Sequence, residues 1–222
     1  MGELFSEFPV WSAFFMTIKV CLLAGAIAFA VGTLVAIFRL SHMPVLRSMG
    51  ALYVNVIRNT PLTLLVAFSQ MGLASTLGWH LDKADLYSDN FRWGAVALGV
   101  YTAAFVCEAI RSGVNTVPVG QSEAARSLGL GFRQTLDSIV LPQAFRSAIV
   151  PLGSTLIAMI KNSTVVSIIG VAEIAYLQAD AMEQRPDLMY WILAVVALGF
   201  VVLTLPLGLA TTHFGKRLAV KR

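Results

Sequence analysis

The sequence predicts an all-α membrane protein of about five transmembrane helices, with its N-terminus outside the cell and its C-terminus in the cytoplasm. Three observations support this: the composition, a series of long apolar stretches, and an alternation of charge between the loops. The chain has 222 residues, is 57% hydrophobic and only 13% charged, and has a mean hydropathy of +0.77. A soluble domain carries about 25% charged residues and cannot hide so much apolar surface, which excludes a soluble enzyme.

Five stretches approach the length of about 20 apolar residues that a helix needs to cross roughly 30 Å of hydrocarbon. They are residues 11–38, 60–79, 93–110, 147–172 and 188–212. Their only charged residues are Lys19, Glu108 and Lys161. The N-terminus carries Glu3 and Glu7 in place of a basic region, so we expect the first stretch to be a retained helix and not a cleaved signal peptide.

Charge alternates between the segments that follow these stretches. The segments after the first, third and fifth stretches are basic and contain Arg39, Arg47, Arg58, Arg111, Arg126, Arg133, Arg146, Lys216, Arg217, Lys221 and Arg222. The segments after the second and fourth are acidic and contain Asp82, Asp85, Asp89, Asp180, Glu183 and Asp187. Basic loops face the cytoplasm under the positive-inside rule, which gives the orientation stated above and an odd number of spans.

The cysteines and histidines form no metal-binding pattern. Cys21 and Cys107 lie in apolar stretches, and we expect both to be small buried hydrophobic residues. His42, His80 and His213 are isolated from one another, so no metal site is predicted.

The segment 111–146 is too long and too polar for a simple turn. Residues 123–128 favour a helix, and Gly129 is placed to end it. A second, amphipathic helix is indicated by residues that share one face, namely Phe132, Thr135, Leu136, Ile139 and Val140, and Pro142 follows them. The small residues of the first helix would let another protein approach its backbone closely. A loop that simply folds on itself fits these residues equally well.

This segment resembles the EAA loop of ABC-importer permeases. The family pattern is E-A-A, three residues, G, nine residues, I, one residue, L-P. Every fixed position is met, by Glu123, Ala124, Ala125, Gly129, Ile139, Leu141 and Pro142. Composition alone would rarely produce such a match.

Other stretches are similar to the polar amino acid uptake branch of these permeases. Residues 58–62 resemble its R-x-T-P-L element, and residues 161–164 with 169–173 resemble its fourth-span element. Residues 58–64 and 122–132 look most similar to permeases of glutamate uptake systems.

The resemblance implies a type I ABC-importer permease fold, with residues 1–222 as a single transmembrane permease domain in the bacterial plasma membrane. The helix with Glu123, Ala124, Ala125 and Gly129 would couple the permease to an ATP-binding cassette ATPase dimer, which binds ATP and Mg. The other implied partners are a second permease (sister or identical chain), an extracytoplasmic substrate-binding protein and membrane lipid. Nucleic acid is not an expected partner.

We expect no cofactor and no ATP hydrolysis in the chain itself. Gly215 and Lys216 are the nearest approach to a phosphate-binding loop. Ala210 replaces its first glycine and Arg217 its serine or threonine, so the pattern fails.

Lys161 is the candidate substrate-binding residue, because an ionisable residue inside a span is costly and therefore a functional candidate. Asn162, Ser163 and Thr164 follow it, and all three are good N-cap residues. We hypothesise a break in the fourth helix that aims free N–H groups at a carboxylate of an amino acid. Alternatively, Lys161 pairs with an acid of a partner permease or extends to an interface.

Lys19 is expected to extend to the outer interface, and Glu108 to pair with Arg111 within one helix. Two other functional classes are open: an ATP-independent secondary amino acid transporter or channel subunit, and a membrane scaffold without transport activity. The EAA pattern argues against the first, and a scaffold would give the intramembrane lysine no role.

Overall fold

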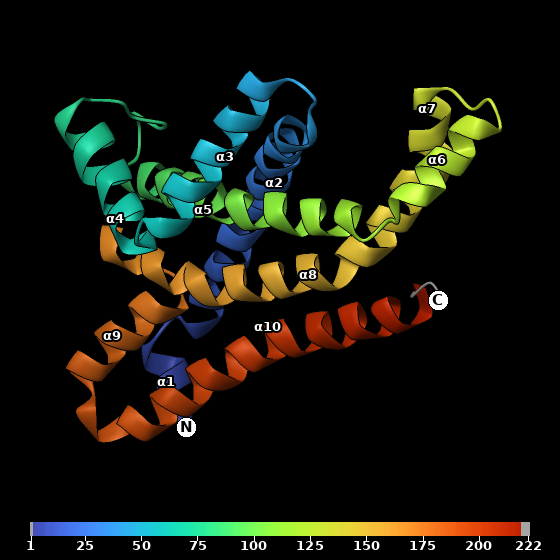
Figure 1. Ribbon diagram of the computed structural model, residues 1–222. Helices are drawn as coiled ribbons and strands as arrows, with labels where there is room; N and C mark the ends of the chain where they lie inside the picture. The colour runs from blue at the N-terminus through green and yellow to red at the C-terminus, as the bar shows by residue number, and fades with distance from the viewer. Residues whose placement is uncertain (1, 219–222) are drawn as a thin grey trace.

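The computed structural model describes residues 2–218, which form helices joined by short connections, with no strand in that range (Figure 1). The elements are α1 (Gly2–Glu7), α2 (Val10–Leu40), α3 (Pro44–Asn59), α4 (Leu62–Ala67), η1 (Phe68–Thr76), α5 (Leu86–Asn115), α6 (Val119–Ser127), α7 (Phe132–Thr135), η2 (Leu136–Val140), α8 (Leu141–Asn162), η3 (Ser163–Ile169), α9 (Ile174–Gln184), η4 (Pro186–Leu188) and α10 (Met189–Leu218). Lys221 and Arg222, part of the last predicted basic segment, lie outside the described residues.

Within the described residues, four helical runs are long and apolar enough to cross a membrane, and a bent pair counted as one span brings the number to five. The four runs are Val10–Leu40, Leu86–Asn115, Phe132–Ile169 and Pro186–Arg217. The bent pair joins Pro44–Asn59 to Leu62–Thr76 at an angle of 100°. The prediction of about five spans is therefore confirmed, and the second span is broken.

The helix α5 lies at the centre of the fold, packed against α2 and α8 (Figure 1). Gly99 lies against Ile27 of α2, and Gly32 of α2 lies against Ala103. From the first contact to the second, the residue numbers rise in both helices, so α2 and α5 run in the same direction. A Cβ atom at Gly32 would approach the Ala103 carbonyl within 2.8 Å, so the lack of a side chain permits this close crossing.

The helix α8 runs opposite to α5. Gly113 near the end of α5 lies against Ala148 near the start of α8, while Gly94 near the start of α5 lies against Val166 just beyond α8. The helix α10 packs along α8 and reverses direction again.

These directions give the bundle two ends. The basic end carries the connection 41–43, the helices α6 and α7, and the end of α10. The acidic end carries the connection 77–85 and α9, and Arg185 there holds Glu7 of the N-terminal segment at 2.6 Å. The packing thus reproduces the alternation of basic and acidic loops, whereas the orientation relative to the cell stays a prediction.

The segment after the first span is not a loop. The helix α3 fills most of it, and Val54 of α3 is buried with Ala104 and Cys107 of α5. Polar residues are mixed with apolar ones along the sequence of α3, so hydropathy averaged along the sequence hides the helix. Pro61 starts a new helix after the bend, since proline favours an extended conformation for the residue before it.

The predicted amphipathic helix after Gly129 does not stand alone. The helices α7, η2, α8 and η3 form one continuous run, Phe132–Ile169, although Pro142 lies within it. The π-helical turn η2 ends at Val140, two residues before Pro142, and the wider turn tolerates a residue that has no N–H to donate. The fourth span therefore begins inside the segment 111–146.

Candidate functional site

The helix α6 ends in a glycine-dependent turn, as the sequence predicts. The Leu130 N–H donates to the Ala125 carbonyl, and the Gly129 N–H donates to the Arg126 carbonyl. This pair of bonds is the Schellman motif, which requires a left-handed residue, and Gly129 has φ +81°. The turn reverses the chain between α6 and α7.

The α6 hairpin (α6, the turn and α7) projects at the basic end of the molecule (Figure 1). Ala125 and Thr135 are buried in it, while Glu123, Ala124 and Gly129 are exposed at its surface. Three large apolar side chains are also exposed: Val119, Leu128 and Phe132. Leu128 is 82% exposed, an unfavourable state for an apolar residue in water.

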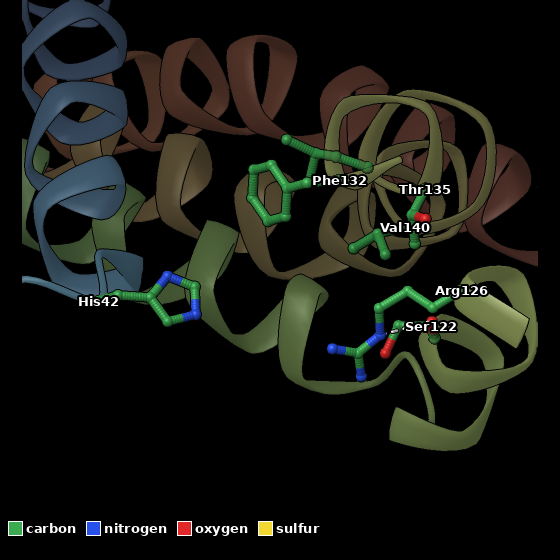
Figure 2. Close-up of a pocket in the computed structure, with 7 residues that line it drawn as sticks. His42, Ser122, Arg126, Phe132, Thr135 and Val140 are labelled. Atoms are coloured by element: carbon green, nitrogen blue, oxygen red, sulfur yellow. Dashed lines mark hydrogen bonds between the residues drawn. The ribbon is translucent and has the colours of Figure 1, made fainter. Parts of the chain in front are cut away.

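A hollow of about 290 Å³ lies at the base of this hairpin. Figure 2 shows its lining: Ser122 and Arg126 of α6, Phe132, Thr135 and Val140 of the following run, and His42 from the connection between α2 and α3. The side chain of Gln143 donates to Gln121 and so ties α6 to the start of α8. The hairpin is thus attached to the fourth span and is otherwise free to meet another molecule.

The second candidate site is a pocket of about 240 Å³ between α5 and α8. It is lined by Tyr101, Thr102, Phe105, Ser154, Thr155, Ala158, Met159 and Asn162. Most of this lining is apolar or aromatic, with hydroxyl and amide groups among it. A pocket of this kind suits a small polar molecule with an aliphatic part.

Lys161 is exposed beside this pocket. It follows the lining residues Ser154 and Ala158 at intervals of four and three, so all three share one face of α8. Within residues 2–218 no carboxylate pairs with Lys161, and the Asn162 amide makes no side-chain hydrogen bond. Both groups remain available for a ligand.

The expected break in the fourth helix is absent. The backbone continues from α8 into the 3₁₀ helix η3 without a side-chain cap, and it ends at Gly170, where φ is +80°. The Ser163 hydroxyl is buried and donates to the Ile160 carbonyl, and the Thr164 hydroxyl donates to the Lys161 carbonyl. These back-bonds replace the N-cap geometry, because a helical carbonyl lies within reach of each hydroxyl.

Arg58 is a functional candidate that the sequence analysis placed in a loop. It lies at the end of α3, at the bend, with its Cζ atom 5.2 Å from the centre of the Phe105 ring that lines the pocket. No carboxylate pairs with it in the described range. Two features of the sequence could have drawn attention to Arg58: the stretch around it contains no acidic residue, and a proline follows three residues later.

Glu108 pairs with Arg111 at 2.8 Å, as predicted, and also with Arg39 of α2. The triad therefore links α2 to α5 across the basic end. Lys19 lies on α2 and makes no ion pair with another described residue, which fits the expected extension to an interface.

The acidic end contains an ordered connection that the sequence did not reveal. The carboxylate of Asp89, 1% exposed, accepts hydrogen bonds from the Leu81 and Asp82 N–H groups and lies 2.9 Å from His80 Nδ1. Arg92 pairs with Asp82 at 2.9 Å. These contacts hold residues 80–82 against the start of α5.

Comparison with known proteins places the chain among transport proteins of similar sequence. Residues 28–220 match the family model described as binding-protein-dependent transport system inner membrane component. The chain is 45% identical over 214 residues to the glutamate transport system permease protein GluC of Corynebacterium glutamicum, which covers 95% of this chain and 94% of that protein. It is 36% identical to the probable glutamine ABC transporter permease protein GlnM of Bacillus subtilis, over 97% of this chain and 96% of that protein.

A solved structure agrees with the same fold. The crystal structure of an amino acid ABC transporter with histidines superposes with a TM-score of 0.82 at 30% identity, over 94% of this chain and 93% of that one.

Proposed function

Because this chain belongs to the family of binding-protein-dependent transport system inner membrane components, we propose that it is the permease subunit of an ATP-driven importer for glutamate or a related polar amino acid. The family comprises transport subunits and not enzymes, and the chain is a multi-pass protein of the plasma membrane. Transport would proceed by alternating access, with the N-terminus outside and the C-terminus in the cytoplasm.

The observation that carries this proposal is the complete EAA pattern: its first part lies in the exposed α6 hairpin, and its last part, Ile139, Leu141 and Pro142, lies beyond the hairpin in the fourth span. Glu123 and the small residues Ala124 and Gly129 are exposed on this hairpin, and Leu128 is exposed beside them. Such a surface would enter a groove on an ATPase subunit, where the apolar side chain would be buried. The bond between Gln121 and Gln143 would then pass movement of the hairpin directly to the fourth span.

The remaining partners complete the importer. An ATP-binding cassette ATPase dimer would bind ATP and Mg, a second permease would close the pathway, and an extracytoplasmic substrate-binding protein would deliver the amino acid at the acidic end. The ordered residues 80–82 would give that protein a firm surface.

Substrate would bind in the pocket between α5 and α8. Lys161 would hold the α-carboxylate, and the free Asn162 amide would donate a further hydrogen bond. Ser163 and Thr164 would support the backbone of the site and not contact the substrate, since their hydroxyls donate to backbone carbonyls. The desolvation cost of a lysine at this depth is the reason to assign it a function.

The test of the overall function is reconstitution in liposomes with the copurified ATPase and binding protein. We expect glutamate uptake that requires internal ATP and stops with vanadate. Uptake that persists without ATP and follows an ion gradient would instead establish a secondary transporter.

The test of the site compares Lys161→Met with Lys19→Met, an identical change at another lysine of a span. We expect Lys161→Met to lower affinity for substrate while the complex still assembles and hydrolyses ATP. Unchanged affinity in Lys161→Met would remove the pocket as the substrate site.

A further inference from the structure

The hollow at the base of the α6 hairpin is lined by a buried hydroxyl group without a partner. Thr135 is only 6% exposed, and its side-chain oxygen makes no hydrogen bond to another described residue. Hydroxyls within a helix ordinarily bond to a carbonyl one turn back, as those of Thr155 and Thr204 do. Figure 2 shows the Thr135 side chain extending from its own helix toward α6. An unsatisfied buried hydroxyl at the wall of a hollow points to a ligand that completes its hydrogen bonding.

Two nitrogen-bearing side chains line the same hollow from different segments. Arg126 of α6 donates through Nε to the Ser122 carbonyl, so its two terminal nitrogens have no partner among the described residues. His42 comes from the connection between α2 and α3, and its ring likewise has no described partner. Within residues 2–218 no carboxylate lines the hollow. These groups offer hydrogen-bond donors and positive charge without a compensating acid, which favours an anionic ligand.

The remaining lining is apolar and consists of Phe132, Leu136 and Val140. The hollow also lies at the ends of two runs that are long and apolar enough to cross a membrane. The run Val10–Leu40 ends two residues before His42, and the run Phe132–Ile169 begins at a lining residue. The ends of spans lie at the level of the lipid headgroups. The anion that fits this place is therefore one with an apolar part attached.

We propose that this hollow binds the phosphate group of an anionic membrane phospholipid, held by Arg126, His42 and the Thr135 hydroxyl, with the lipid's apolar part against Phe132. Basic pockets between transmembrane helices suit lipid headgroups, and a guanidinium group can bind a phosphate through two parallel hydrogen bonds. A histidine ring can donate to a phosphate oxygen whether or not it carries a charge. The inference goes beyond the proposed function, because it concerns neither the substrate pocket nor the transported molecule.

The test is native mass spectrometry of the purified permease–ATPase complex, titrated in detergent with dioctanoyl phosphatidylglycerol or dioctanoyl phosphatidylcholine. We expect phosphatidylglycerol, the anionic lipid, to bind at least about tenfold more tightly than the zwitterionic lipid. Arg126→Gln should weaken phosphatidylglycerol binding by about tenfold or more, because a hydrogen bond between charged groups is lost. Arg133→Gln is the matched control: it removes an exposed arginine of the same hairpin that does not line the hollow, and binding should not change.

Thr135→Val separates a ligand-binding role from a structural one. It removes the hydroxyl and keeps the shape of the side chain, so the lipid-free complex should be at least as stable as the wild type. Phosphatidylglycerol should then raise the melting temperature of Thr135→Val less than that of the wild type, because binding is weaker. Lower stability without lipid, combined with an undiminished effect of lipid, would contradict the role of the hydroxyl.

Four results would overturn the proposal. The first is equal affinity for the two lipids, and the second is an equal loss of binding in Arg126→Gln and Arg133→Gln. The third is displacement of phosphatidylglycerol by inorganic phosphate at millimolar concentration, which would establish a site for a soluble anion. The fourth is release of the ATPase in Arg126→Gln with unchanged lipid binding, which would make the hollow an ATPase contact. Should Arg126→Gln fail to assemble, Arg126→Lys decides: severalfold weaker binding with a retained preference for phosphatidylglycerol supports the proposal, and unchanged binding contradicts it.

Discussion

Replacing Gly129 should damage energy coupling without damaging the fold. Gly129 has φ +81°, and no atom lies within 4 Å of the position that a Cβ would take. In Gly129→Ala the new Cβ therefore causes no steric clash. The free-energy cost is that of holding an L-residue in the left-handed conformation, about 1–2 kcal/mol. That free energy lowers the population of the native hairpin turn by a factor of roughly 5–30.

Gly120 provides a matched control. A Cβ at Gly120 would likewise meet no atom within 4 Å, but this glycine lies inside α6 and has no positive φ. Gly120→Ala should be neutral or slightly stabilising, because alanine favours a helix by about 1 kcal/mol relative to glycine. The assay is glutamate-stimulated ATP hydrolysis and uptake in liposomes, with basal hydrolysis as reference. Equal activity in Gly129→Ala and Gly120→Ala would refute the reasoning.

Three further changes test the packing. Glu108→Gln should lower the stability of the solubilised complex by about 1–3 kcal/mol, between the values for exposed and for buried ion pairs, because two partly buried arginines lose their charged partner. Asp89→Ala should destabilise the connection at the acidic end by about 1–3 kcal/mol and speed trypsin cleavage after exposed Lys83. Gly113→Ala should cost about 1–3 kcal/mol in thermal stability, because its Cβ would stand 2.5 Å from a carbonyl of α8.

Two substitutions serve as controls for these measurements. Glu183→Gln removes an exposed acid that forms no ion pair with another described residue, so stability and trypsin sensitivity should stay as in the wild type. Gly208→Ala places a Cβ at an ordinary 3.6 Å from Ile157, so it should be tolerated. Losses in the controls as large as those in the test variants would contradict the packing argument.

The parts of the fold that depend on local physics could be predicted from the sequence. Long apolar runs identify spans because hydrocarbon offers the backbone no other partner. Gly129 identifies the end of α6 because glycine tolerates the left-handed conformation that the turn needs.

The remaining features depend on tertiary contacts. The helix α3 was mistaken for a loop because its polar residues lower the hydropathy averaged along the sequence; Val54 is buried on α5, whereas Met49 and Leu52 are exposed. Pro142 does not interrupt the fourth span, and the π turn η2 lies just before it. The predicted break at residues 162–164 is absent, because the Ser163 and Thr164 hydroxyls bond to carbonyls of their own helix. The bend before Leu62 is a separate break, in the second span.

The same distinction applies to the candidate sites. The α6 hairpin is contiguous in sequence, so its residues can be recognised together. The pocket joins α5 to α8 and brings Arg58 from α3 beside Phe105, and no local pattern encodes that meeting of distant segments.

The most direct test is the exposure of the α6 hairpin, measured by maleimide labelling of Ser127→Cys after Cys21 and Cys107 are replaced by alanine. In right-side-out vesicles a membrane-impermeant maleimide should not react, whereas in inverted vesicles it should react once the ATPase has been stripped away and be blocked when the ATPase is restored. Labelling from the outer face, or labelling that the ATPase does not affect, would contradict the account.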